Sequence, residues 1–218
     1  MTLLEIEKMK NGIDNLEYII KKLTKNKIFY WVDQGTLLGL VRENNILPWD
    51  TDIDISVWAN DFKKVLLLEE EFTLDGYYFE YQADYDAIFL SKGTDFYIEI
   101  AKQATDGDFV FRYNSLPQKS KLALFFKFFL KLFPEKIHFP IRDFLRKRSS
   151  NDLLLSKTPL HFFQDFSVAD FNNIKSVNIP SKSREYLLFK YGQNWETPNQ
   201  KWAYEESDGS VILGRQDD

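Results

Sequence analysis

Three aspartates at every second position of a short stretch constrain the fold more than any other feature of the chain. Asp50, Asp52 and Asp54 lie in "DTDIDISVW", which spans residues 50–58. On a β-strand, residues two positions apart point to the same face, about 7 Å from each other. Two ionised carboxylates at that separation repel by roughly 2 kcal/mol at an effective dielectric constant near 20. The pattern therefore predicts a strand with an acidic face that needs a cation, and Mg²⁺ binds carboxylates together with water and phosphate oxygens.

Two other interpretations of these aspartates are weighed against a metal site. The acidic face could simply be exposed to solvent, as on many half-buried strands. The stretch also matches a calcium-binding loop at its first, third and fifth positions, but Ile55 stands where such a loop needs glycine for its sharp turn. Asp61 stands where the loop uses a bidentate glutamate. The calcium loop is therefore disfavoured.

The elements around the aspartates predict a mixed α+β fold. Apolar residues recur at three- and four-residue steps up to about Lys25, which is typical of an amphipathic helix. Residues 27–33 read as a buried strand and 36–44 as a short helix opened by a glycine and a threonine. A capped helix over 60–72 is expected next. Further strands are expected over 77–82, 87–91, 95–101 and 109–113.

Composition narrows the classes of protein. The 218 residues are 44% hydrophobic, which is enough for a substantial core, and contain no cysteine. Absence of cysteine excludes disulfides and thiolate metal sites and fits a cytoplasmic location. A net charge of −5 argues against nucleic-acid binding. Neither a spanning apolar segment of about 18 residues nor a signal peptide is recognised.

The charge is unevenly distributed along the chain. Residues 119–148 contain nine Lys or Arg residues against two acidic ones, interspersed with phenylalanine. Such a segment can pack on the main sheet with its lysines solvated. Alternatively, it can lie peripherally on the inner face of an anionic membrane. Packing is the favoured interpretation. Residues 116–206 are expected to form a mostly helical region that completes a core of residues 1–115, and residues 207–218 a flexible acidic tail.

Residues upstream of the aspartates are candidates for binding phosphate. Gly35 allows the backbone to approach a ligand, and the Thr36 hydroxyl and the amides at the helix start can donate to phosphate. Arg42, two turns on, could bind a phosphate with its fork of donors or be a solvated helix arginine. Asp33 and Gln34, at the end of the first strand, could contact ligand or cap the helix. Strand, Gly-Thr turn, helix and two-aspartate strand is the order found in polymerase-beta-like nucleotidyltransferases.

The stretch "WVDQGTLLGLVRENNILPWDTDIDISV" resembles the LicD family of phosphocholine and fukutin-like phosphoalcohol transferases. The later stretch "VNIPSKSREYLLFKYGQNWETP" is similar to the closing segment of the same family. The resemblance implies a polymerase-beta-like nucleotidyltransferase core with an N-terminal helix and added C-terminal helices. It also implies transfer of a phosphorylated alcohol, such as phosphocholine or ribitol phosphate, from a CDP-activated donor to a sugar hydroxyl of a cell-surface glycan precursor, which can be lipid-linked.

The resemblance also assigns residues. The family's metal-binding pair falls on Asp52 and Asp54, and its glycine and hydroxyl residue on Gly35 and Thr36. A third carboxylate is usual on a neighbouring strand. Glu99 is the first candidate for this carboxylate, and Asp95 is the second. These acids would hold Mg²⁺, with Mn²⁺ as the alternative, and Glu99 would also serve as a catalytic base. A glycosyltransferase with an Asp-x-Asp metal site and a catalytically silent binding module are the rival functions.

Overall fold

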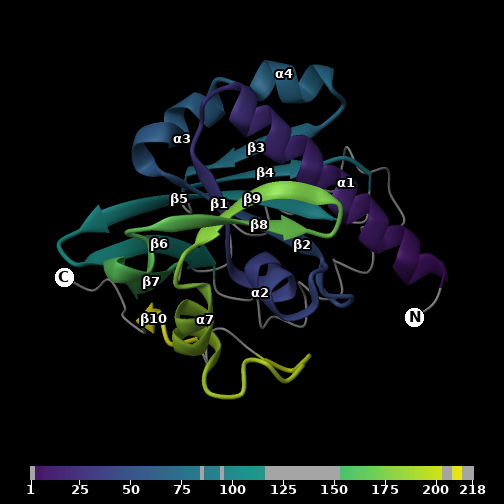
Figure 1. Cartoon of the computed structure of the whole chain (residues 1–218). Coiled ribbons are helices and arrows are strands. Elements are labelled where there is room, and N and C mark those ends of the chain that lie inside the picture. Colours follow the sequence, from purple (N-terminus) through teal and green to yellow (C-terminus); the bar gives the residue numbers. More distant parts are fainter. Residues whose placement is uncertain (1–2, 84–85, 94–95, 116–152, 203–207, 213–218) are drawn as a thin grey trace, which may run out of the picture.

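The structure, a computed structural model, describes residues 3–83, 86–93, 96–115, 153–202 and 208–212. It begins with α1 (Leu3–Lys25), which ends where the sequence predicts and runs diagonally across the upper right of the view in Figure 1. Ile6, at the start of the predicted apolar stripe, is 46% exposed. The remainder of the stripe is buried in the main core: Met9, Ile13, Leu16, Ile20 and Leu23.

The predicted order of strand, turn, helix and strand is present. β1 (Tyr30–Val32) leads into α2 (Gln34–Glu43), and β2 (Asp52–Trp58) returns antiparallel to β1. Asp50 lies just before β2 rather than within it. The inward face of β2 carries Ile53, Ile55 and Val57, which are at most 1% exposed. Burial of these side chains anchors the strand, so the direction of its aspartates is fixed by its packing.

Two helices stand where one was expected. α3 (Ala59–Leu66) and α4 (Glu69–Leu74) divide the predicted helix over residues 60–72. The chain turns at Leu67, which is 82% exposed, whereas Leu68 and Phe72 are buried. The break between α3 and α4 thus leaves Leu67 exposed while Leu68 and Phe72 pack in the core.

The main sheet mixes parallel and antiparallel pairs. β3 (Tyr78–Gln82), β4 (Ala87–Ser91), β5 (Tyr97–Asp106) and β6 (Phe109–Ser115) follow in sequence. The first half of β5 lies between β2, to which it is parallel, and β4, to which it is antiparallel. The last residues of β5 pair with β6. This mixed sheet with helices confirms the predicted α+β fold class.

The second half of the described chain contains more strand than the sequence suggested. β7 (Leu153–Pro159) extends the main sheet beside β6, and β8 (Phe166–Phe171) and β9 (Ile174–Pro180) form a separate hairpin. A short 3₁₀ helix, η2 (Leu160–Phe162), follows β7, and α7 (Ser183–Tyr191) is the helix of the closing segment. The β-branched residues Ile174, Val177 and Ile179 of β9 favour a strand, which the expectation of a mostly helical region overlooked.

Residues 208–212 also differ from the expected loose tail. β10 (Val211–Ile212) pairs with β7, and Asp208 forms a buried ion pair with Lys190 of α7. Gly209 makes this close approach possible, since a Cβ there would lie 2.1 Å from the Phe189 carbonyl oxygen. The chain after α7 is therefore tied back to the sheet at this point.

The helices flank the strands. In the view of Figure 1, α1, α3 and α4 lie above most strands and α2 and α7 below them, while the β8–β9 hairpin packs against β1 and α1. The buried aromatic side chains of Trp31, Phe163 and Tyr186 join these elements. None of the helices in the described ranges combines the length and apolar character needed to cross a bilayer.

Candidate active site

Asp33 holds the beginning of α2 in place. Its side chain accepts hydrogen bonds from the Gln34 amide at 2.8 Å, from the Ser56 hydroxyl at 2.7 Å and from the Tyr186 hydroxyl at 2.8 Å. The residue is 2% exposed. A buried carboxylate needs such donors because an uncompensated one is very costly. Asp33 is thus the N-cap of α2, one of its two expected roles, and it joins α2, β2 and α7.

Gly35 and Thr36 lock the start of α2 to the aspartate strand. The Gly35 amide donates to Asp54 Oδ2 at 3.0 Å, and the Thr36 hydroxyl oxygen accepts from the Asp54 amide at 2.7 Å. A Cβ on Gly35 would lie 2.9 Å from Asp50 Oδ2 and 3.3 Å from Asp54 Oδ2. Glycine therefore allows the carboxylates of Asp50 and Asp54 to pack against its Cα, a reason that the sequence pattern alone does not reveal.

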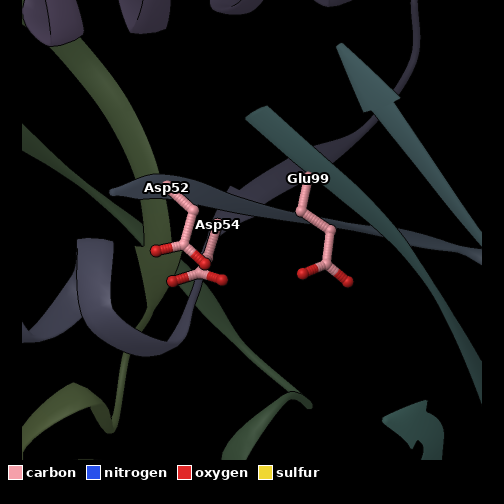
Figure 2. Close-up of side chains that lie close together, drawn as sticks. All are labelled: Asp52, Asp54 and Glu99. Atoms are coloured by element: carbon pink, nitrogen blue, oxygen red, sulfur yellow. The ribbon is translucent and has the colours of Figure 1, made fainter. Parts of the chain in front are cut away.

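Three carboxylates lie close together where β2 and β5 pair. In the parallel register, Asp54 lies beside Glu99, and Asp52 lies one pleat away on the same face of β2. One oxygen from each of Asp52, Asp54 and Glu99 lies within 4.8 Å of the others (Figure 2). Three carboxylate oxygens form a donor set suited to a hard divalent cation. This group could hold a metal ion. Asp95 lies outside the described residues.

The carboxylates raise one another's pKa values. Burial, followed by repulsion from Asp52 and Glu99, raises the pKa of Asp54 well above its usual value. Loss of hydration and repulsion from Glu99 raise the pKa of Asp52, although its side chain still reaches the surface. Burial and repulsion from Asp52 raise the pKa of Asp50 to about 7. The cluster thus resists full ionisation, and a divalent cation would relieve this resistance.

Arg112 of β6 is a site residue that the sequence reasoning missed. Its Nη2 donates to Glu99 Oε1 at 2.5 Å, and both side chains are largely buried. Burial alone would lower the pKa of Arg112, but the carboxylates around it, Glu99 first, raise it. The guanidinium also lies against the side-chain amide of Gln34, whose oxygen accepts from it when the amide is oriented to satisfy both groups. The sequence signal is a single arginine inside the aromatic strand "FVFRY", whose neighbours across the sheet cannot be read from the sequence.

Arg42 is largely buried rather than solvated, and among the described residues it forms its ion pair with Glu43 and not with the three clustered carboxylates. Its side chain is 8% exposed and pairs with Glu43 at 2.7 Å. The guanidinium lies over the Trp49 ring, 5.7 Å from the centroid, and is 3.5 Å from the Trp195 carbonyl oxygen. Arg42 therefore connects α2 with the chain that follows α7, and its attraction still moderates the raised pKa of Asp50.

The C-terminal segment completes the surroundings of Arg112. A narrow polar pocket beside it is lined in part by Gln34, Gln103, Thr158, Tyr186 and Lys190. Burial and the neighbouring Asp33 raise the pKa of the Tyr186 hydroxyl well above its usual value, so this hydroxyl remains a donor. The basic segment 119–148, with its expected membrane contact, lies outside the described residues.

More than half of the chain matches the model of a known protein family. The family model described as "LicD/FKTN/FKRP, nucleotidyltransferase domain" matches residues 27–147, more than half of the chain. This match defines the chain as a nucleotidyltransferase domain. It belongs to the LicD family, as its motifs indicated.

Curated relatives agree with this family. The human ribitol-5-phosphate transferase FKTN is 24% identical over 204 residues, which cover 93% of this chain and 37% of that protein. The uncharacterized protein RP689 of Rickettsia prowazekii is 41% identical over 64 residues, 29% of this chain and 24% of that protein. The match thus spans 24% to 37% of the length of these relatives. Among solved structures, the lincomycin-bound lincosamide antibiotic adenylyltransferase LnuA is similar over 79% of this chain and 82% of its own, with 16% identity and a TM-score of 0.42.

Proposed function

We propose that this chain transfers a phosphorylated alcohol from a CDP-activated donor to a sugar hydroxyl, releasing CMP. The observation that carries the proposal is the convergence of Asp52, Asp54 and Glu99 beside the Gly35 turn. Membership of the LicD family, and the relatives named ribitol-5-phosphate transferases, support the class of reaction. Phosphocholine, ribitol phosphate and glycerol phosphate are all candidate groups, and a glycan or lipid-linked glycan is the candidate acceptor.

Each residue has a proposed part in the transfer. Asp52, Asp54 and Glu99 would hold Mg²⁺ or Mn²⁺, which neutralises charge on the donor diphosphate when bound. Glu99 would accept the proton of the acceptor hydroxyl directly or through water. The acceptor oxygen then bonds to the phosphorus that carries the alcohol, the anhydride bond breaks, and CMP leaves with the bonding electrons. The opening of α2, including Gln34, Gly35 and Thr36, is the proposed phosphate-binding turn, with Asp33 and Arg42 as further substrate-binding candidates.

Release of CMP from a panel of CDP-alcohols tests this function. CDP-choline, CDP-ribitol and CDP-glycerol are each incubated with Mg²⁺ or Mn²⁺ and a panel of acceptor sugars, with EDTA as the metal-free arm. Asp52→Asn combined with Asp54→Asn should abolish release, because both acidic ligands are lost. Asp170→Asn is the matched control, since Asp170 is 54% exposed and pairs with Lys175 on the β8–β9 hairpin.

Three outcomes would contradict the proposal. Undiminished CMP release by the double variant would remove the carboxylates from the mechanism. Release of UDP or GDP from nucleotide sugars, without reaction of any CDP-alcohol, would favour a glycosyltransferase. Absence of binding to every nucleotide by calorimetry would favour a silent binding module.

A further inference from the structure

Arg112 is placed between two groups of charges. Its Nη2 donates to Glu99 Oε1, the guanidinium lies against the Gln34 side chain, and Asp33 and Tyr186 line the same small pocket. Its Nε is buried and has no hydrogen-bond partner among the described residues. A buried donor without a partner is rare in native proteins and asks for an explanation. The guanidinium therefore keeps donor capacity that the described residues around it do not use.

Because Arg112 is paired with Glu99, Arg112 and a metal ion would compete for the Glu99 carboxylate. Within the described ranges, the Arg112–Glu99 pair is the one ion pair that involves a member of the Asp52, Asp54 and Glu99 group. A metal ion at this group would share the Glu99 carboxylate with Arg112, which bonds to Oε1, and the fixed positive charge nearby would repel the metal. The protein alone is consequently a weak metal site, because its own cation takes part of the charge that would attract the metal.

A phosphate group would change this balance. The guanidinium fork matches phosphate oxygens as well as it matches a carboxylate, and an unused Nε–H adds a further donor. A nucleotide that brings phosphates to the site would give Arg112 new acceptors and leave Glu99 free for the metal. The polar pocket beside Arg112 is lined by hydrogen-bonding side chains, including those of Gln34, Gln103 and Tyr186.

The backbone conformation of Gln34 supports a role for Arg112 in binding phosphate. Gln34 has φ 46°, in the left-handed region, which is uncommon for a residue with a side chain. The Asp33 cap on one side and the Asp54-bound Gly35 amide on the other hold this conformation. Strained backbone of this kind is found at functional sites when the surroundings impose it. Here it places the side-chain amide of Gln34 against Arg112.

We propose that Arg112 contacts the donor phosphates and couples nucleotide binding to metal binding. This inference rests on the proposed function, because it assigns the phosphates to a CDP-containing donor. Coupling of two ligands is reciprocal, so the metal strengthens nucleotide binding by the same factor by which the nucleotide strengthens metal binding. The consequence is an active site that acquires its metal together with its substrate.

Calorimetry on the full chain measures this coupling. The probes are Mn²⁺ alone, CDP alone, and CDP in saturating Mn²⁺, applied to the wild type, Arg112→Gln and Arg112→Lys. Arg184→Gln is the matched control, because Arg184 is 68% exposed and pairs with Glu196. In the wild type, Mn²⁺ should strengthen CDP binding at least about tenfold, within the range typical of coupled sites.

The two measurements should move in opposite directions in Arg112→Gln. Mn²⁺ alone should bind about threefold to tenfold more tightly, because a competing positive charge is gone. CDP in the presence of Mn²⁺ should bind at least about tenfold more weakly, because the phosphate loses a charged donor. Arg112→Lys keeps the charge and loses the fork, so its Mn²⁺ affinity should stay within about threefold of wild type while CDP binding weakens about fivefold or more. Arg184→Gln should match the wild type in all three titrations.

The outcomes separate this inference from the proposed function. A wild type that fails to bind CDP with Mn²⁺ overturns both. Wild-type coupling that persists unchanged in Arg112→Gln overturns the role of Arg112 alone, as does a lowered melting temperature with both affinities unchanged, which indicates a purely structural residue. If Arg112→Gln does not fold, Arg112→Lys decides the question, and an unaltered CDP affinity in that variant refutes the coupling.

Discussion

Replacement of Gly35 by alanine should separate stability from ligand binding. The new Cβ would lie 2.9 Å from Asp50 Oδ2 and 3.3 Å from Asp54 Oδ2, so both carboxylates must shift. These atoms are side-chain ends that can rotate, and alanine gains about 0.5–1 kcal/mol over glycine within a helix. We therefore expect the free energy of unfolding to change by no more than about 1 kcal/mol, or a few degrees in melting temperature.

Binding should respond much more strongly, because one of the two displaced carboxylates, Asp54, is a proposed metal ligand. Melting curves with and without Mn²⁺ measure both effects. The wild type should gain stability as Mn²⁺ is added, since a ligand that binds the folded state stabilises it, and Gly35→Ala should lose most of that gain.

Gly39→Ala on the same helix is the matched comparison. Its Cβ would lie 2.4 Å from the Asn45 backbone oxygen, which cannot rotate away. A loss of about 1–3 kcal/mol is expected from this overpacking, with the Mn²⁺-dependent gain retained. The reasoning fails if Gly35→Ala keeps the full Mn²⁺-dependent gain, or if it destabilises the protein as much as Gly39→Ala does.

Three further substitutions test the charges of the site. Because the folded-state pKa of Asp54 is raised, its ionisation removes stability as the pH rises above about 4. Asp54→Asn should therefore be more stable than wild type at pH 7 in EDTA, and the difference should vanish near pH 4. Equal urea midpoints at pH 7 would contradict this expectation. Tyr186→Phe leaves buried Asp33 with one donor fewer and should cost about 1–3 kcal/mol in urea unfolding; a neutral result would mean that water replaces the hydroxyl. Lys190→Met leaves Asp208 buried without its cation and should cost about 3–5 kcal/mol, most of which the double variant with Asp208→Leu should restore; an unrestored double variant would indicate packing rather than charge.

The sequence was most informative where a local pattern decides the structure. The period of the apolar residues predicted α1, and the alternation at residues 51–58 predicted the acidic strand, because both depend on neighbours along the chain. The Gly-Thr turn and the closing helix were likewise visible in short motifs. Gly35 was identified as a glycine for ligand approach, whereas the structure shows the carboxylates of Asp50 and Asp54 against it.

Features that depend on strand order could not be read in this way. Arg112 acts beside Glu99 only because β6 folds back along β5, and β7 occupies the other edge of β6. Sheet neighbours are set by tertiary packing rather than by local preference, so an isolated arginine in a strand gave no sign of its partner. The order of the tail at residues 208–212 depends on Lys190, which is again distant in sequence.

The contacts of the closing segment have a consequence for protein synthesis. Tyr186 reaches Asp33, and the Trp195 carbonyl oxygen receives Arg42, across 153 residues in each case. A ribosome therefore releases the acidic strand well before the helix that steadies its neighbouring cap. While translation continues, the nascent chain holds Asp33 without its tyrosine donor until the first turn of α7, which carries Tyr186, has left the exit tunnel.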